Sequence, residues 1–203
     1  MQAFGFCSFV FSLYNYNMKK LFVISGSSGV GKGTVINGFL ERNPDFSLSI
    51  SCTTRPKRPG EIDGVNYFFL TRSEFETAVQ NGEFLEWAEF AGNLYGTRRQ
   101  NIKDNIILEI DTQGALQVKA KTPEAVLIFI CPPSFEALEA RLRGRGTEDE
   151  ETIQKRLDFV RQELELAKQF DYQIVNDNVE NTIAQLEHVI ASTGGQSGAK
   201  QSS

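Results

Sequence analysis

The sequence predicts an α/β fold of three layers, in which a parallel β-sheet is flanked by helices on both faces. Two observations support this fold class. Short apolar runs alternate with helical segments along most of the 203 residues, and this alternation is typical of βαβ units. In addition, the first apolar run leads through a glycine-rich turn into a helix, as phosphate-binding loops do. A small α+β insertion and a mobile lid complete the predicted architecture.

Four apolar runs of the kind found in fully buried strands are each followed by a helical segment. The pairs are Leu21–Ser25 and a helix through Leu40, Ile106–Asp111 and Gln113–Lys121, Ala125–Cys131 and Ser134–Arg143, and Tyr172–Asn176 and Val179–Ala191. A further helix from Glu151 to about Gln169 places Ile153, Leu157, Val160, Leu164 and Ala167 on one face, which should pack against the core.

Two stretches interrupt the alternation. Residues 48–97 predict a small α+β module with the strands Leu48–Cys52, Tyr67–Leu70 and Phe84–Phe90 around the helix Ser73–Asn81. Gly144–Glu151 combines glycines, arginine and acids between two helices and is predicted to be a mobile connection. We therefore expect a core of residues 18–47 and 98–191, a lid at about 141–156, and a separate module at 48–97.

Both ends of the chain are expected to lie outside the fold. Residues 1–17 are uncharged and precede Met18, Lys19 and Lys20; because the basic residues follow the apolar run, a downstream translation start is a simpler interpretation than a secretory signal. Residues 192–203 consist largely of Gly, Ser, Gln and Lys, a composition that buries little apolar surface and predicts disorder.

Composition argues against several classes of function. The net charge of −5 disfavours a nucleic-acid-binding protein, and no membrane partner is expected. The cysteines Cys7, Cys52 and Cys131 have no metal-ligand or redox spacing, which indicates reduced thiols in a cytoplasmic protein. The single histidine, His188, lies late in a predicted helix, so serine–histidine or cysteine–histidine catalysis has little support.

A phosphate-binding loop follows the first predicted strand and opens the first helix, which is the context that this motif requires. Its glycines let backbone N–H groups turn toward phosphate oxygens, the helix N-terminus adds partial positive charge, and the lysine reaches the β- and γ-phosphates of a nucleoside triphosphate. The alternative is a glycine-rich turn with a chance lysine, which the spacing disfavours. The loop comprises Gly26, Ser27, Ser28, Gly29, Val30, Gly31, Lys32, Gly33 and Thr34.

The loop departs from the usual motif at its magnesium position. Ser or Thr ordinarily follows the lysine directly and binds Mg²⁺, whereas here Gly33 takes that place and Thr34 comes one residue later. Mg²⁺ is expected as the cofactor of a triphosphate donor, with Thr34 binding it directly or through water.

A phosphate-binding loop alone is compatible with a GTPase, an ATPase motor or a small kinase. The acceptor site must distinguish them. Arg55 and Arg58 stand three residues apart in a strand-to-loop segment, and two guanidinium groups can hold one phosphate between them. The hydroxyls of Tyr67 and Tyr95 would complete this grip. A solvated pair of surface arginines is the alternative.

At this point the sequence resembles the guanylate kinase family, from about Lys20 to Ala191. The resemblance implies ATP-dependent phosphorylation of GMP to GDP, and also of dGMP, by a core domain, a GMP-binding module and a lid. Its motifs occur in the family's order: the phosphate-binding loop, Ser51–Glu61, Gly64–Phe68, Phe84–Trp87, Tyr95–Thr97, Asp111–Gly114 and Arg145–Glu148.

The resemblance also implies roles for individual residues. Arg55, Arg58, Tyr67 and Tyr95 match ligands of the GMP phosphate, and Ser51, Glu86, Thr97 and Asp111 match residues that recognise guanine. The chemistry agrees, because a carboxylate such as Glu86 can accept from the N1–H and N2 amino donors of guanine, whereas adenine lacks the N1–H. Arg145 and Arg156 match the family's lid and lid-helix arginines and, with Lys32, would stabilise the transferred phosphoryl group. Arg141 is a further candidate for this role, and charge balance with Glu148–Glu151 is its alternative. For Arg143, this role and simple charge balance with Glu148–Glu151 remain equally open.

The segment from Thr97 to Glu109 is several residues shorter than the resemblance implies, so Arg98–Asp104 should form little more than one or two helical turns. Two alternatives to a guanylate kinase remain open. The first is a non-catalytic module that uses the GMP cleft to bind a phosphopeptide, and the second is a kinase for another nucleoside monophosphate, such as AMP. The sequence leaves the oligomeric state undetermined.

Overall fold

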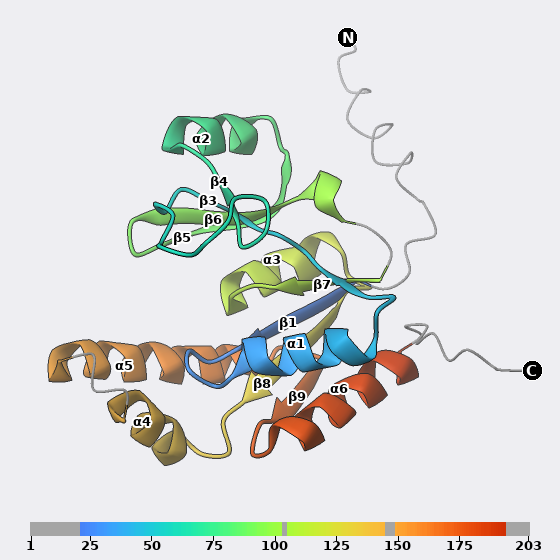
Figure 1. The fold of residues 1–203 in the computed structure, drawn as a ribbon, viewed down its shortest axis with the longest axis vertical. Coiled ribbons are helices and arrows are strands. Elements are labelled where there is room, and N and C mark those ends of the chain that lie inside the picture. Colours follow the sequence, from blue (N-terminus) through green and yellow to red (C-terminus); the bar gives the residue numbers. More distant parts are fainter. Residues whose placement is uncertain (1–20, 103–104, 145–148, 194–203) are drawn as a thin grey trace, which may run out of the picture.

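The computed structural model describes residues 21–102, 105–144 and 149–193. The predicted N-terminal extension, most of the predicted tail, and Arg145 of the predicted lid lie outside the described residues. Within the described ranges, the fold consists of a core with a five-stranded sheet and a second sheet of four strands, which lies above the core in Figure 1.

The core sheet is parallel throughout, with the strand order β2-β7-β1-β8-β9. Its strands are β1 (Phe22–Gly26), β2 (Ser47–Leu48), β7 (Ile106–Glu109), β8 (Val126–Cys131) and β9 (Tyr172–Val175). The central strands are runs of aliphatic and aromatic residues, as expected for a sheet that is covered on both faces. The predicted α/β class is confirmed.

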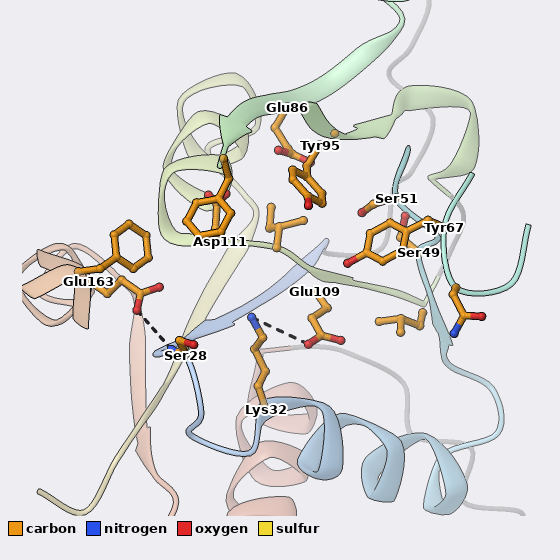
Figure 2. A pocket seen from close by; sticks show the side chains of 17 residues that line it. Ser28, Lys32, Ser49, Ser51, Tyr67, Glu86, Tyr95, Glu109, Asp111 and Glu163 are labelled. Carbon is orange, nitrogen blue, oxygen red and sulfur yellow. Dashed lines mark hydrogen bonds and ion pairs between the residues drawn. The ribbon is translucent and has the colours of Figure 1, made fainter. Parts of the chain in front are cut away.

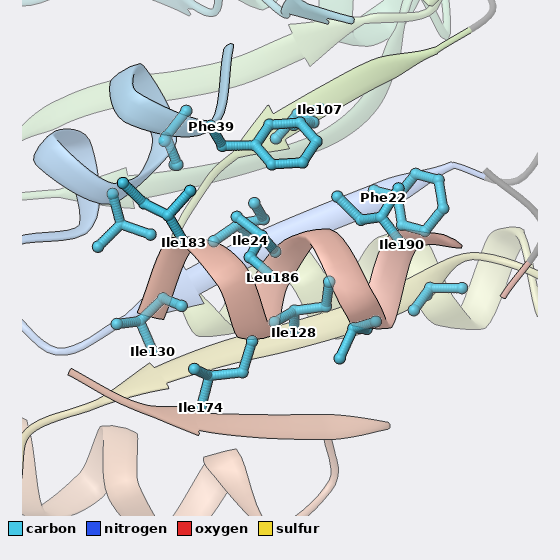
Figure 3. Packing of buried hydrophobic residues seen from close by; sticks show 14 of the residues in the cluster. Phe22, Ile24, Phe39, Ile107, Ile128, Ile130, Ile174, Ile183, Leu186 and Ile190 are labelled. Carbon is cyan, nitrogen blue, oxygen red and sulfur yellow. The ribbon is translucent and has the colours of Figure 1, made fainter. Parts of the chain in front are cut away.

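Helices cover the two faces of this sheet and make three layers. On one face, α1 (Lys32–Arg42) and α6 (Val179–Ser192) bury Phe39 and Leu186 against the side chains of Phe22 and Ile24 (Figure 3). On the other face, α3 (Thr112–Lys121) packs against Val23 and its neighbours. Successive residues of β1 thus enter opposite cores, because side chains alternate along a strand.

The second sheet has the order β4-β3-β6-β5 and belongs to the predicted α+β module. Its strands are β3 (Cys52–Thr53), β4 (Phe68–Phe69), β5 (Phe84–Phe90) and β6 (Asn93–Arg98). The helix α2 (Arg72–Gln80) begins with a capping box between Thr71 and Glu74, which satisfies its first backbone donors. Phe75 of this helix stacks on Phe84, with ring centroids 4.3 Å apart.

The prediction of a single strand over Leu48–Cys52 is wrong. Ser47–Leu48 forms β2 at the edge of the core sheet, and Cys52–Thr53 forms β3 of the module sheet. Residues 49–51 carry the chain from one sheet to the other, so one apolar run serves two different sheets. No strand was predicted for β6, whose residues include glycine and asparagine.

The shortened segment after β6 forms one 3₁₀ turn, Arg99–Asn101, in its described part. The Asn101 side chain donates a hydrogen bond from Nδ2 to the Ile50 carbonyl at 3.3 Å. The two stretches that connect the module to the core are therefore joined to each other at this point.

The helices α4 (Phe135–Arg143) and α5 (Glu150–Ala167) lie at one end of the core in Figure 1. They pack through Leu138, Leu157 and their apolar neighbours. The Arg143 guanidinium bonds to Glu139 and Glu150 on these helices, which favours the charge-balance interpretation of Arg143. Among the residues that the structure describes, no helix is long and apolar enough to span a membrane.

Candidate active site

The phosphate-binding loop connects the end of β1 at Gly26 to the start of α1 at Lys32. Two of its glycines have positive φ, +83° at Gly29 and +93° at Gly31, a conformation that costs glycine little. Gly31 stands at the N-cap position and no side chain caps the helix. The first N–H groups of α1 therefore remain available to an anion, as at other helix N-termini that bind phosphate.

A short chain of hydrogen bonds from Asn176 and Thr182 holds the phosphate-binding loop. The Asn176 side chain donates from Nδ2 to the Val30 carbonyl at 2.8 Å, and the Thr182 hydroxyl donates to Asn176 Oδ1 at 3.0 Å. Asn176 and Thr182 are both buried. Because their polar atoms are paired and excluded from water, this contact should fix the arch of the loop firmly.

A cavity of about 500 Å³ lies between the loop and the module, within the size range of ligand pockets. In Figure 2, Lys32 and Ser28 lie at one end, and Glu86, Tyr95 and Ser51 at the other. The residues that line it are Gly26, Ser28, Lys32, Leu48, Ser49, Ser51, Asn66, Tyr67, Glu86, Phe90, Tyr95, Gly96, Glu109, Ile110, Asp111, Phe159 and Glu163. The structure thus brings part of the predicted site to one space. From the donor side these residues are Gly26, Ser28 and Lys32, and from the acceptor side they are Ser51, Tyr67, Glu86, Tyr95 and Asp111.

Lys32, the first residue of α1, extends into this cavity. Its Nζ lies 3.9 Å from Oε1 of Glu109 at the end of β7, and both side chains are largely shielded from solvent. At this distance the pair is a loose ion pair without a good hydrogen bond. The ammonium group can therefore turn to a phosphate without breaking a strong contact.

Glu86 occupies the opposite end of the cavity and is only 4% exposed. Burial raises the pKa of its carboxyl to about 7, hydrogen bonding from Thr97 partly offsets that effect, and the nearby Asp111 carboxylate adds to it. Its Oε1 has no hydrogen-bond partner within the described residues. A buried carboxylate oxygen without a partner is costly, so this atom is suited to a ligand that brings hydrogen-bond donors.

Three further predicted residues surround Glu86. The Ser51 and Thr97 hydroxyls lie 3.5 Å apart, and Thr97 is fully buried behind the cavity wall. Asp111 caps α3 by accepting from the Gly114 backbone N–H at 2.7 Å. This cap leaves the carboxylate of Asp111 on the cavity wall close to Glu86. The cavity wall beside Glu86 thus offers the Ser51 hydroxyl as a donor and carboxylate oxygens as acceptors.

The predicted phosphate ligands are brought together only in part. Arg55 lies over the Tyr67 ring, with its guanidinium carbon 5.6 Å from the ring centroid, and Tyr67 and Tyr95 contact each other edge to face. Arg58 is exposed and does not line the cavity. Glu61 accepts from Arg55 Nη2 at 2.6 Å and from the Arg58 backbone N–H at 2.7 Å, so it fixes the turn that carries both arginines.

The predicted residues of the donor side also differ in whether they line the cavity. Gly33 and Thr34 are exposed on the first turn of α1, outside the cavity lining. Arg156 lies half-buried on α5. Arg141 lies on α4, and its side chain, like all of Arg145, is outside the described part of the chain.

Sequence reasoning missed two carboxylates of the cavity, Glu109 and Glu163. Glu109 ends the strand next to β1, and an acid at the end of a strand beside the phosphate-binding loop is a signal that could have identified it. Glu163 lies within the apolar face of α5, where nothing in the pattern marks it. Phe90 and Phe159, with ring centroids 5.7 Å apart, were also not predicted.

A magnesium site built by the protein alone is not supported. Within 21–102, 105–144 and 149–193, the His, Cys, Asp and Glu side chains form no group of three or more that could hold a metal ion. Mg²⁺ bound with a nucleotide needs less, because it keeps several waters and uses one or two carboxylates together with phosphates. Glu109, 3.9 Å from Lys32, fits that smaller requirement.

The chain is similar to known proteins of one family over most of its length. A model of the guanylate kinase family matches residues 18–193. Guanylate kinase from Synechococcus sp. (strain CC9311) is 52% identical over 171 residues, which cover 81% of this chain and 90% of the relative. Guanylate kinase from Nostoc sp. (strain PCC 7120) is 49% identical over 174 residues, covering 83% of this chain and 87% of the relative.

A solved structure gives the same result in three dimensions. The crystal structure of guanylate kinase from Anaplasma phagocytophilum superposes with a TM-score of 0.71 at 33% sequence identity, and the match covers 88% of each chain. The family model spans all of the described residues, and the relatives are similar over most of their own length. The chain belongs to the guanylate kinase family.

Proposed function

We propose that this chain phosphorylates GMP to GDP with ATP as donor, and dGMP likewise, and so serves nucleotide salvage and the supply of GTP and dGTP. One observation carries the proposal. A single cavity has the phosphate-binding loop with Lys32 at one end and the buried Glu86 carboxylate at the other, and Oε1 of Glu86 has no hydrogen-bond partner among the described residues. Two nucleotides bound at these ends would face each other with their phosphates between them, as phosphoryl transfer requires.

In the proposed reaction, an oxygen of the GMP phosphate attacks the γ-phosphorus of ATP. The new bond to phosphorus forms as the bond to the bridging oxygen of ADP breaks, and the charge spreads over the equatorial oxygens. The protein contributes position and charge. Lys32 and the N–H groups at the start of α1 hold the triphosphate, and Arg141, Arg145 and Arg156 approach the transferred group.

Magnesium is proposed as the cofactor, bound with ATP. Glu109 and Thr34 are the residues proposed to hold it, directly or through water, and it would supply neutralisation of the β- and γ-phosphate charge. Neither residue needs to form a complete ligand set, because phosphate oxygens and water provide the remainder.

On the acceptor side, Glu86 is proposed to accept from N1–H and the N2 amino group of guanine, and Ser51 to donate to O6. Thr97 and Asp111 support the same edge. Arg55, Arg58, Tyr67 and Tyr95 are proposed to bind the GMP phosphate. Arg58, which is exposed, would have to turn inward when GMP binds.

The test is a coupled assay of ADP release with GMP, dGMP, AMP, UMP and CMP as acceptors. Turnover with GMP and dGMP at an efficiency at least about 10⁴-fold above that with AMP is expected, since a site built around hydrogen bonds rejects ligands that lack the partners. A preference for AMP would show a different nucleoside monophosphate kinase. No turnover with any acceptor would show the non-catalytic interaction module.

A cytoplasmic location and the absence of nucleic-acid or membrane partners are part of the same proposal. The free thiols of Cys52 and Cys131 and the net charge of −5 support it.

A further inference from the structure

Glu163 is a buried carboxylate to which the proposed function assigns no role. It is 5% exposed and lies on α5, on the face that otherwise buries Ile153, Leu157, Val160 and Ala167. Burial raises the pKa of this carboxyl to about 7, the Ser28 N–H and Lys32 act in the opposite direction, and Asp111 adds to the increase. An acid is a costly choice for this position, because an apolar side chain would be buried without that penalty.

The carboxylate makes one contact that an apolar residue could not make. Its Oε2 accepts from the backbone N–H of Ser28 at 3.4 Å, across 135 residues of sequence. Figure 2 shows this contact at the loop end of the cavity, beside Lys32. The phosphate-binding loop is therefore held on two sides, by Asn176 at the Val30 carbonyl and by Glu163 at the Ser28 amide.

The helix that carries Glu163 also carries Arg156, seven residues earlier. Seven residues are close to two helical turns, so both residues lie on nearly the same side of α5, about 10 Å apart along its axis. A contact that fixes Glu163 on the loop therefore fixes where Arg156 stands relative to the phosphates that the loop holds.

We infer that Glu163 is a positioning residue, whose carboxylate docks α5 on the phosphate-binding loop and thereby places Arg156 for phosphoryl transfer. The inference builds on the proposed function, since it assigns Arg156 to the transferred group. It differs from a purely structural role, because the effect of Glu163 on turnover must pass through Arg156.

The decisive experiment is a double-mutant cycle with Glu163→Met, Arg156→Ala and the combination. Methionine is unbranched and adaptable, fills the buried position and removes the acceptor. Glu163→Met alone should lower kcat by about 10- to 100-fold, as small misplacements of catalytic groups do, with the KM for GMP changed less than about twofold. In the Arg156→Ala background, the same change should lower kcat by less than about threefold.

Two matched variants complete the design. Glu163→Gln keeps an oxygen that can accept from Ser28 and should retain kcat within about fivefold of the parent. Glu165→Met removes an exposed acid of the same helix that pairs with Lys168 and should change kcat less than about twofold. Multiplicative losses in the double mutant, or full activity of Glu163→Met, would overturn the inference.

Hydrogen exchange gives a readout that does not depend on activity and separates this inference from the proposed function. In Glu163→Met the Ser28 amide should exchange at least about tenfold faster than in the parent chain, whereas Glu163→Gln should change it little. If the parent failed to phosphorylate GMP, the proposed function would fail while the docking contact could still be observed. Unchanged exchange in Glu163→Met would refute the docking itself.

Discussion

Lys32 lies beside a carboxylate of the protein and is also the residue expected to contact a bound triphosphate. Lys32 stands 3.9 Å from Glu109, which is close enough for attraction and too far for a strong hydrogen bond. Such a pair holds the ammonium group in the cavity at little cost. A triphosphate, which carries more charge than one carboxylate, can then recruit the lysine without a large reorganisation.

Lys32→Ala is expected to reduce kcat by about 10²- to 10³-fold, because it removes a cation from the charge that develops on the transferred phosphate. GMP should still bind with a nearly unchanged dissociation constant, since Glu86 and Tyr67 lie at the other end of the cavity. Turnover by the coupled assay and GMP binding by calorimetry measure the two effects. A variant that lost GMP binding would contradict the proposed division of the site.

Single residues differ in how far sequence alone reveals them. Lys32, Glu86 and Asp111 stand in recognisable local motifs, and each lines the cavity. Glu163 could not be found in this way, because a helical pattern identifies buried positions by their apolar residues, and the pattern selected Leu164 beside it. The contact with Ser28 crosses 135 residues and leaves no local signal.

At the scale of elements, helix α3 shapes the end of the cavity that contains Glu86 through Gly114, a residue that has no side chain. A Cβ atom on Gly114 would lie 2.6 Å from Oε2 of Glu86, well inside van der Waals contact. The Glu86 carboxylate is buried and cannot move away freely. Gly114 therefore gives the carboxylate room, although glycine weakens a helix by about 0.5–1 kcal/mol relative to alanine.

Gly114→Ala is accordingly expected to raise the KM for GMP about tenfold or more, while the KM for ATP stays within about twofold. Helix propensity alone would predict only a more stable helix and no change in binding. Ala120→Gly, an exposed position of the same helix, is the matched control and should lower stability without affecting GMP. Equal changes in both KM values for Gly114→Ala would show that Glu86 is not the affected group.

The elements of the core could be predicted more completely than those of the module. Long runs such as the one that became β8 are buried on both faces, and the sequence identifies them by length and composition. The strands β2, β3 and β4 have two residues each, too few to show a period. Their pairing depends on tertiary contacts, which explains why Leu48–Cys52 was predicted as one strand.

At the scale of the whole molecule, the cavity concentrates negative charge. Four carboxylates line it, Glu86, Glu109, Asp111 and Glu163, with Lys32 as the cation among its described lining residues. The pKa values of Glu86 and Glu163 are both raised to about 7, chiefly by burial. An acid with a raised pKa binds its proton more tightly in the folded state than in the unfolded state, so ionisation of these two groups opposes folding.

The free energy of unfolding should therefore fall by about 1–3 kcal/mol as pH rises from about 5 to about 7, and then level off. The window lies between the ordinary pKa of a glutamate and the raised values near 7. Urea unfolding of the ligand-free chain at several pH values measures it. Glu86→Gln should flatten the slope, and a profile that rises through this window or is unchanged in the variant would contradict the assignment.

The two connections between the sheets also have an evolutionary consequence. All of the module, from β3 to β6, is one continuous stretch of chain, and its entry and exit meet where Asn101 bonds to Ile50. A stretch whose ends lie side by side can be exchanged as a unit, because its replacement leaves the core residues on either side of it in the same positions. Recombination at these two points would exchange Tyr67, Glu86 and Tyr95 together, whereas Asp111, Gly114 and the phosphate-binding loop would be inherited unchanged.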